Sequence, residues 1–334
     1  MDDQSFQFGV ELELLLGSRK NPHANWKSLA KDLSKRLLKA GIPNHVNDSN
    51  DKSAANYTEW SIVQEVTIPS QPAKSFCTLN PSSYPQSHTK SCLVGLELVS
   101  PIYPAYSYWA SDLQTIFSVL HAHFALIPSP HCSTHVHISP ISSPFSVTQL
   151  SSLSKSILYF ESPLDLAFPQ DRTSYWCQSN RLNPSLSQLS LSQCLSAVNS
   201  TSADDNNSPR GIVELMNLFP ATSAYGRAQR KKRDFVRGKV YKWDLTGVLP
   251  GARGEVEFRQ APGSVEAGEA AGWITLAVAF VAGAVRDGVV GVGEGTDEEE
   301  GATVEELLGV LRVGAGLVGW EGLGDVEELF FVGS

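Results

Sequence analysis

Four short segments of this chain carry ionisable side chains at alternate positions, with apolar residues between them. They are Glu11 and Glu13 in GVELELL, Glu97 in GLELVSP, His135 and His137 in THVHISP, and Glu257 and Arg259 in GEVEFRQAP. Successive side chains of a β-strand point to opposite faces, so each segment predicts a strand with one apolar and one polar face. Because a buried charge is costly unless it is paired or bound to a metal, we expect the four polar faces to meet at one site.

The segments between these strands predict helices and loops without a regular alternation of strand and helix. Apolar residues at helical spacing mark helices over 25–41, 111–126, 147–161 and 186–198, and a buried helix is expected after Ser264. Thr303 and Glu306 form a capping-box pattern that predicts a further helix. Strands dispersed in this way favour an α+β fold with a mostly antiparallel sheet and helices packed on one face.

Loop composition indicates how the chain is organised. We expect one domain over residues 1–285, with loop insertions near 71–90, which is rich in Pro and Ser, and near 200–211, which reads STSADDNNSPRG. Residues 286–334 contain an acidic, Gly-rich loop followed by helices, and we assign them to the same domain.

Charge and cysteine content argue against several classes of protein. The net charge of −9 gives no reason to expect nucleic acid as a partner, and the basic run 227–242 is interpreted as a solvated loop rather than a nuclear-type signal or a phosphate-attracting rim. The N-terminus has no signal-peptide pattern, and the apolar run 270–285 is shorter than the roughly 20 residues that cross a membrane. Five cysteines without a CxxC pair predict reduced thiols and a cytoplasmic location.

Each of the four polar segments has a simple structural explanation when it is taken alone. Glu-x-Glu on a strand is usually a solvated face, His-x-His can pack without binding a metal, and Glu-x-Arg is most often a surface ion pair. The order of all four along the chain, together with their apolar neighbours, is what favours a shared functional site.

The order of these motifs resembles the amidoligase family, which is distantly similar to glutamine synthetase and the glutamate–cysteine ligases. The shared elements are GVELE, W-x-I-x-x-E, GLELVSP, HVH, YKWDL and EFRQAPGS followed by a Trp-bearing helix, over about Phe6 to Val285. The resemblance implies a glutamine-synthetase-like sheet in an amidoligase domain. It also implies an ATP-dependent ligase that joins a small-molecule or peptide carboxylate to an amine through an acyl phosphate, with Mg²⁺ or Mn²⁺.

The family pattern, carried over position by position, implies a role for each polar residue. The metal ligands would be Glu11, Glu13 and Glu97 for one ion, with His135 and Glu257 completing a second position. The nucleotide contacts would be His137 to the ATP phosphates, Arg259 to the transferring γ-phosphoryl group, and Arg172 in DRTSYWC to the nucleotide or a substrate carboxylate. Catalysis would rest on Glu257 and Arg259.

Two positions depart from the family pattern. Ser133 stands where a glycine is common, which we expect to change how closely the backbone approaches phosphate. Glu65 stands where an aspartate is common, which we expect to change substrate preference. Neither departure removes an implied ligand.

The implied chemistry suits these residue types. Transfer of a phosphoryl group to a carboxylate gathers negative charge, which hard cations with oxygen ligands and a guanidinium group stabilise. Two other functions stay open: a metal-dependent hydrolase that uses His135, His137 and Glu257 around one ion, and a non-catalytic protein that retains the fold. Dependence on ATP would separate them. The sequence leaves the identity of the substrates and the oligomeric state open.

Overall fold

The computed structural model describes residues 5–19, 23–49, 57–72, 92–173, 177–202, 208–218, 240–286 and 301–330. The strands are β1 (Phe6–Ser18), β2 (Asn44–Val46), β3 (Trp60–Gln64), β4 (Gln71–Pro72), β5 (Cys92–Val99), β6 (Tyr103–Pro104), β7 (Phe124–Ile127), β8 (Thr134–Pro140), β9 (Trp243–Asp244) and β10 (Val256–Phe258). The α-helices are α1 (Trp26–Lys39), α3 (Trp109–His123), α4 (Val147–Tyr159), α5 (Glu161–Asp165), α6 (Leu191–Ser202), α7 (Arg210–Asn217), α9 (Ala267–Arg286) and α10 (Val304–Leu317). Short 3-10 helices are η2 (Gln170–Thr173), η3 (Asn180–Leu182), η4 (Thr246–Val248) and η5 (Gly324–Phe330).

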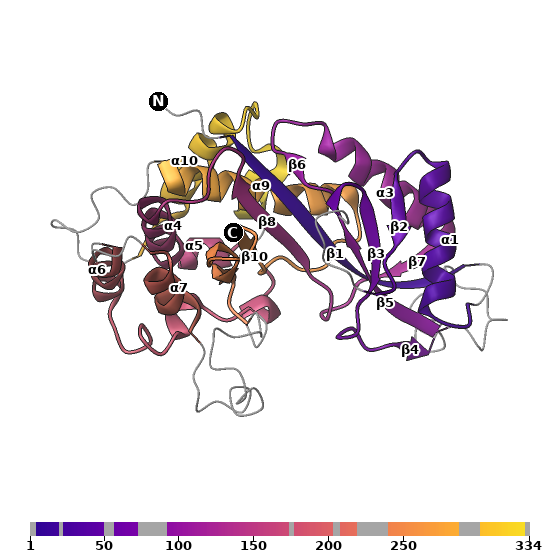
Figure 1. Ribbon diagram of the computed structural model, residues 1–334, viewed down its shortest axis with the longest axis horizontal. Helices are drawn as coiled ribbons and strands as arrows, with labels where there is room; N and C mark the ends of the chain where they lie inside the picture. Colours follow the sequence, from indigo (N-terminus) through magenta and orange to yellow (C-terminus); the bar gives the residue numbers. More distant parts are fainter. Residues whose placement is uncertain are drawn as a thin grey trace.

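One sheet organises the molecule, with strand order β2-β3-β5-β1-β8-β10-β9 (Figure 1). The long strand β1 is central and pairs with β5 on one side and β8 on the other. Every described strand pair is antiparallel except β2 with β3. This open, mostly antiparallel sheet with associated helices confirms the predicted mixture of elements and the predicted strand direction.

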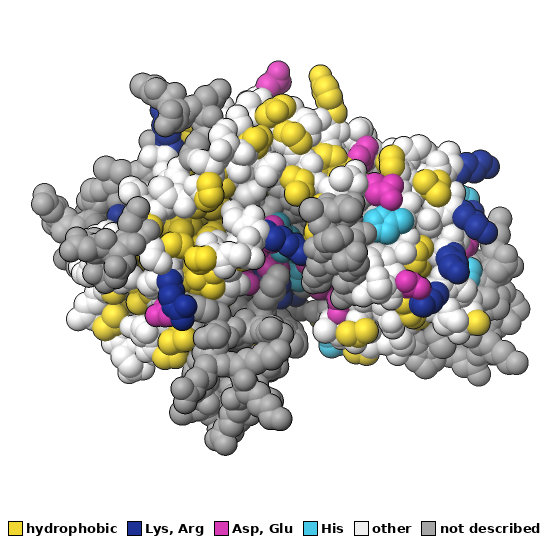
Figure 2. Space-filling model, in the orientation of Figure 1, with side chains coloured by type: hydrophobic (Ala, Val, Ile, Leu, Met, Phe, Trp, Pro, Cys, Tyr) yellow, Lys and Arg dark blue, Asp and Glu magenta, His cyan; other side chains and the backbone are white. Residues whose placement is uncertain are grey.

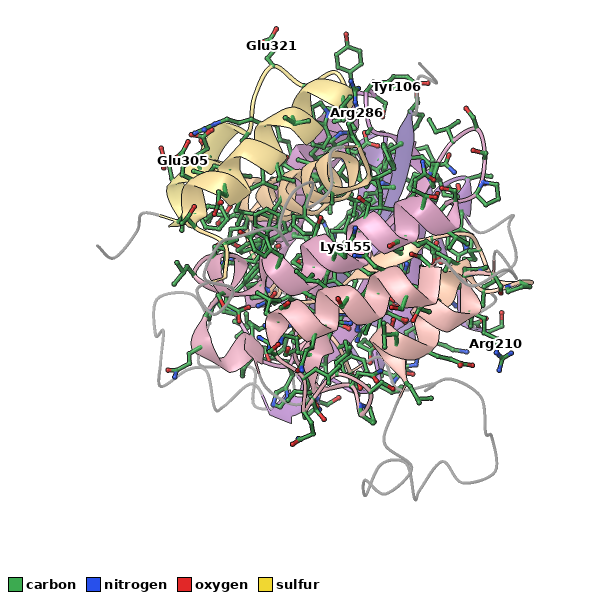
Figure 3. The ribbon with its side chains drawn as sticks, turned by 90° about the vertical axis from the view of Figure 1, so that its left-hand side faces the viewer. Tyr106, Lys155, Arg210, Arg286, Glu305 and Glu321 are labelled. Atoms are coloured by element: carbon green, nitrogen blue, oxygen red, sulfur yellow. The ribbon has the colours of Figure 1, made fainter. Side chains whose placement is uncertain are left out.

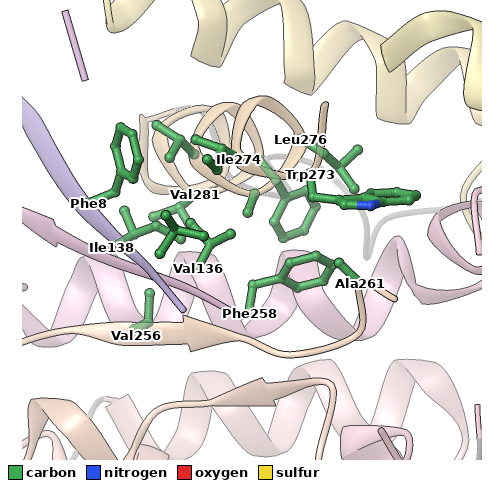
Figure 4. Close-up of a cluster of buried hydrophobic side chains, with 14 of the residues drawn as sticks. Phe8, Val136, Ile138, Val256, Phe258, Ala261, Trp273, Ile274, Leu276 and Val281 are labelled. Carbon is green, nitrogen blue, oxygen red and sulfur yellow. The ribbon is translucent and has the colours of Figure 1, made fainter. Parts of the chain in front are cut away.

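Alternation along the strands gives the sheet one apolar face. Phe8 and Leu12 of β1, Val136 of β8 and Phe258 of β10 all belong to a single buried hydrophobic cluster. Figure 4 shows several of these side chains facing α9, where Ile274 contributes to the same cluster. Helices α1 and α3 also place their buried residues in this cluster, so they cover the same face as α9. Each fully buried side chain of this kind contributes about 1.5–3 kcal/mol to folding.

Local signals set where several helices begin. Thr303 accepts a hydrogen bond from the backbone N–H of Glu306, whose side chain returns to the Thr303 backbone, so the predicted capping box is confirmed. Asn25 and Ser146 cap α1 and α4 in the same reciprocal manner. Such a cap satisfies backbone donors that have no partner in the first helical turn.

Helix α9 is buried between the sheet and α10. A Cβ atom at Gly314 would lie 1.8 Å from the carbonyl oxygen of Ala279, so only glycine permits this contact between α10 and α9. Among the described helices, α9 is long and apolar enough to cross a membrane, and its 20 residues exceed the run expected from the sequence. However, 67% of its apolar window is buried inside the protein, as in the core helix of a globular fold. Charged residues of the surrounding helices, such as Arg210 and Glu305, lie on the outside (Figure 3).

Several predicted loops differ from the structure or lie outside the described residues. Residues 71–72 form β4, and the remainder of the 71–90 segment is not among the described residues. The loop predicted over 200–211 is shorter, because α6 continues to Ser202 and α7 begins at Arg210. The predicted helix over 186–198 begins later, at Leu191. Most of the basic run 227–242 and of the acidic Gly-rich loop also lie outside the described residues.

Candidate active site

The second face of the sheet brings together all of the predicted strand-borne residues. The cross-strand partners are Glu11 with His135, Glu13 with Glu97, and Glu257 with His137. Arg259 follows β10 directly, and its backbone N–H donates to the carbonyl oxygen of Lys242, which continues the pairing with the β9 side. Figure 2 shows acidic, basic and histidine side chains gathered in a hollow near the middle of the molecule. The four segments therefore meet at one place, as their alternation predicted.

One group of ligands is entirely carboxylate. Oxygen atoms of Glu13, Glu65 and Glu97 all lie within 4.8 Å of one another, a spacing at which they could hold a metal ion. Glu65 follows β3, and the motifs assigned it an effect on substrate preference but no ligand role. A Cβ atom at Gly95 would lie 2.5 Å from the Glu65 carbonyl oxygen, so the glycine lets the two chain segments approach. Thr67 donates its backbone N–H to Glu65 Oε1 at 2.7 Å and so orients this carboxylate.

Crowding of these acids in a buried place changes their protonation. Burial, with a smaller contribution from Glu65, raises the pKa of Glu13 to about 8. Burial and the neighbouring carboxylates Glu11 and Glu13 also raise the pKa of Glu97 well above its usual range. Like charges and a poorly hydrated environment both disfavour the ionised form. This part of the site therefore accepts positive charge, either protons or a cation.

A second group combines two carboxylates with an imidazole. Atoms of Glu11, His137 and Glu257 lie within 4.8 Å of one another. His137 Nε2 is 3.3 Å from Glu11 Oε1 and 3.8 Å from Glu257 Oε1, yet it is buried and makes no hydrogen bond to any described residue. The other ring nitrogen, Nδ1, is 2.9 Å from Glu255 Oε1. An unbonded, buried ring nitrogen between two carboxylates is the arrangement that a cation would complete.

His135 lies between the two groups. Its Nδ1 atom is 3.4 Å from Glu11 Oε2, 3.9 Å from Glu13 Oε1 and 3.7 Å from Glu257 Oε1. Burial, helped by Arg259, lowers the pKa of His135 to about 4. Although burial opposes protonation of His137 as well, Glu257 and Glu11 raise its pKa well above the usual value. The two histidines thus occupy different electrostatic environments only two residues apart.

Arg259 stands at the end of the polar face beside these groups. Its Nη1 atom donates to Glu257 Oε1, and both side chains are buried. Its Nε atom is buried and makes no hydrogen bond to any part of the chain that the structure describes. The guanidinium therefore has donor capacity that its pair with Glu257 does not use.

Arg172 does not join the acids and imidazoles. Its guanidinium donates to the carbonyl oxygens of Arg259, Gln260 and Ala261 at 3.0–3.1 Å, and to Ser133 Oγ at 2.9 Å. These contacts fix the backbone that leaves β10, and Ser133 supports them instead of facing an open site. The predicted contact of Arg172 with a nucleotide or carboxylate remains a prediction.

A cavity of about 300 Å³ opens beside the Glu11 and His137 group. Its lining residues include Gln7, Gly9, Tyr57, Val99, Ser100, Ser139, Arg253 and Glu255. The Arg253 guanidinium lies 4.6 Å from the centre of the Tyr57 ring, a cation–π contact. None of these residues was predicted from the sequence, although Glu255 stands two positions before Glu257, the spacing that places two side chains on the same side of an extended chain.

The fold and this face define the class of protein: a mixed α and β protein that holds an acid-rich site on an open antiparallel sheet. A family model described as "Putative amidoligase enzyme" matches residues 4–281, a range that contains every site residue named above. The chain belongs to this amidoligase family, and the resemblance drawn from its motifs is confirmed. Membership indicates a ligase. A search of curated proteins found no match.

Proposed function

We propose that this protein is an ATP-dependent carboxylate–amine ligase with a glutamine-synthetase-like fold, which forms an amide bond through an acyl phosphate. The observation that carries the proposal is the presence of two separate ligand groups on one sheet face, with Arg259 beside them. Family membership supports ligation as the reaction class. The substrates we expect are a small-molecule or peptide carboxylate and an amine.

The donor set suits Mg²⁺ or Mn²⁺. Glu13, Glu65 and Glu97 would hold one ion, and the group that contains His137 would hold the other. Carboxylate-rich sites favour these hard cations, whereas a dedicated zinc site would offer more imidazole or thiolate. When bound, such ions neutralise the charge of transferring phosphoryl groups. The raised pKa of Glu13 and the unbonded Nε2 of His137 both fit a cation at these positions.

The chain's own residues would act on the phosphoryl group from fixed positions. Arg259 offers a planar, permanently charged fork, held by Glu257, for the oxygen atoms that gain charge during transfer. The resemblance implies that His135 binds metal and that His137 contacts the ATP phosphates, but the geometry favours the opposite assignment. His137 belongs with the metal ligands, whereas His135 lies between the two groups, where its imidazole can reach a phosphate oxygen.

The cavity beside His137 gives room for the nucleotide. Its volume of about 300 Å³ is at the lower end of typical ligand pockets. Tyr57 and Val99 supply apolar surface, while Ser100 and Arg253 supply polar groups. We assign the nucleoside to this cavity, which would place the phosphates toward Glu11 and Glu257.

Calorimetry with a non-hydrolysable ATP analogue tests this function directly. We expect the analogue and Mg²⁺ to bind together and to raise the melting temperature more than either does alone, because ligands that bind the folded state stabilise it. Phosphate release should then depend on adding both a carboxylate and an amine from a panel of candidates. Absence of binding in the presence of Mg²⁺ would contradict the proposal.

One observation favours a metal-dependent hydrolase as the second candidate. Both imidazoles lie within 3.8 Å of the same oxygen atom, Glu257 Oε1, as a single-ion site would require. That function leaves Glu13, Glu65 and Glu97 without a role. Hydrolysis that needs no ATP, together with one zinc ion per chain after dialysis against a chelator, would favour the hydrolase. Nucleotide binding without turnover on any substrate pair would instead favour a non-catalytic protein with the same fold.

A further inference from the structure

Glu255 contacts His137 at Nδ1, the ring nitrogen on the side away from the proposed metal ion. Its Oε1 atom is 2.9 Å from His137 Nδ1, a hydrogen-bond distance. The pair is largely shielded from water, since the side chains of His137 and Glu255 are 8% and 21% exposed. With Nδ1 engaged in this way, Nε2 is directed toward Glu11 and Glu257.

The position of Glu255 is itself constrained by the loop that precedes β10. A Cβ atom at Gly247 would lie 2.4 Å from the Glu255 carbonyl oxygen and 2.9 Å from its Cγ atom, so η4 packs directly on this residue. Gly254, at a φ of +77°, donates its backbone N–H to the Gly247 carbonyl oxygen at 2.8 Å and closes the turn. Arg253 Nη1 is 3.6 Å from Glu255 Oε1 on the cavity side. The carboxylate therefore cannot easily turn away from His137.

We propose that Glu255 is a positioning residue that fixes the ring of His137 so that Nε2, and not Nδ1, is presented to the metal ion. This inference rests on the proposed function, because it takes the Glu11, His137 and Glu257 group to be a metal site. A carboxylate on the remote nitrogen of a ligating histidine orients the ring and increases its basicity, and loss of such a partner typically weakens metal binding about 10–100-fold. Glu255 acts through His137 and need not touch the substrates.

Binding of Mn²⁺ to the full-length protein without nucleotide tests the inference independently of activity. Titration would be followed by calorimetry and by the electron paramagnetic resonance signal of free Mn²⁺. We expect Glu255→Leu to weaken the site that contains His137 about 10–100-fold. Glu255→Gln should stay within about threefold of the natural protein, because its amide oxygen still accepts from Nδ1–H while its charge is gone.

The comparison of these two variants separates positioning from charge. If Glu255→Gln loses as much affinity as Glu255→Leu, the carboxylate acts only through its charge and the inference fails. Glu255→Asp provides a further test if the leucine variant does not fold, since the shorter side chain keeps the charge but withdraws its oxygen from Nδ1. Normal Mn²⁺ affinity in folded Glu255→Asp would equally overturn the inference.

His45 and Glu59 provide a matched control at the β2–β3 edge of the sheet. Their Nδ1 to Oε1 distance is 2.8 Å, and His45 Nε2 is likewise buried without a hydrogen bond to any described residue. Glu59→Leu removes the same kind of contact and should leave Mn²⁺ affinity unchanged. If the natural protein binds no Mn²⁺, the metal centre fails and this inference fails with it. If the natural protein binds Mn²⁺ and Glu255→Leu binds it equally well, the positioning role of Glu255 is wrong while the proposed metal site still stands.

Discussion

The two faces of strand β1 show how one segment serves two opposed purposes. Leu12 and Leu14 are 1% exposed and belong to the hydrophobic cluster, whereas Glu11 and Glu13, one residue away, face the acid-rich site. Burial of leucine stabilises the fold, whereas burial of several carboxylates close together costs free energy. The free energy gained by burying the apolar face therefore offsets the cost of keeping several carboxylates close together on the polar face.

The largest expected effect is on the apolar face. Leu12→Ala should lower the free energy of unfolding by about 2–5 kcal/mol, because it removes buried methyl groups and leaves a cavity. Denaturant unfolding would measure the change. Turnover per folded molecule should remain close to that of the natural protein, since Leu12 points away from the site. If the free energy of unfolding of Leu12→Ala equals that of the natural protein, the apolar face does not supply the stability assigned to it.

The second largest effect is expected on turnover, from a substitution on the polar face. Arg259→Lys should lower turnover by about 10²-fold or more while it leaves the fold and most of the ATP affinity intact, because lysine lacks the planar fork that stabilises a transferring phosphoryl group. Phosphate release would be measured with active carboxylate and amine pairs, and the melting temperature would report on folding. Near-normal turnover in a folded variant would show that Arg259 serves only as a structural partner of Glu257.

A smaller effect concerns pH and the stability of the metal-free protein. Burial and Glu65 raise the pKa of Glu13 from 4.5 to about 8, so between these values the folded state holds a proton that the unfolded state has released. Stability must then fall as the pH rises through this window. We expect the melting temperature to drop by several degrees between about pH 6 and about pH 8.

Glu13→Gln is the control for this pH effect. Glutamine resembles the protonated carboxyl and does not titrate, so the variant should show a shallower fall in melting temperature over the same range. It should also weaken Mg²⁺ binding at the carboxylate group. An identical pH profile in the variant and the natural protein would show that other groups, such as Glu97, account for the whole effect.

The smallest effect is expected for an exposed ion-pair network. Arg312 of α10 contacts Glu305 at 3.0 Å and Glu327 at 3.1 Å, all three at the surface. Such pairs are screened by water and salt and contribute little. Arg312→Gln should leave both melting temperature and turnover unchanged within error. A clear loss would show that surface pairs in this protein are as important as the buried pair of Arg259 and Glu257.

The sequence alone determined that the four polar segments are strands and which side of each one is polar, whereas it predicted a helix over 111–126, the end of which belongs to β7 (Phe124–Ile127). Alternation depends only on the two-residue repeat of an extended chain, so Glu11 and Glu13, or His135 and His137, could be placed on one face without any tertiary information. The capping box at Thr303 was equally readable, because its hydrogen bonds lie within a few residues. The motif order also predicted the family.

Only the tertiary structure decided how these residues are grouped. Glu65 joins Glu13 and Glu97 because β3 pairs with β5, and His137 joins Glu257 because β8 pairs with β10. Arg172 became a support for the backbone after β10 through contacts with residues nearly ninety positions away. Strand order and register depend on long-range packing, and alternation within a strand fixes the face of a side chain but not its neighbour across the sheet.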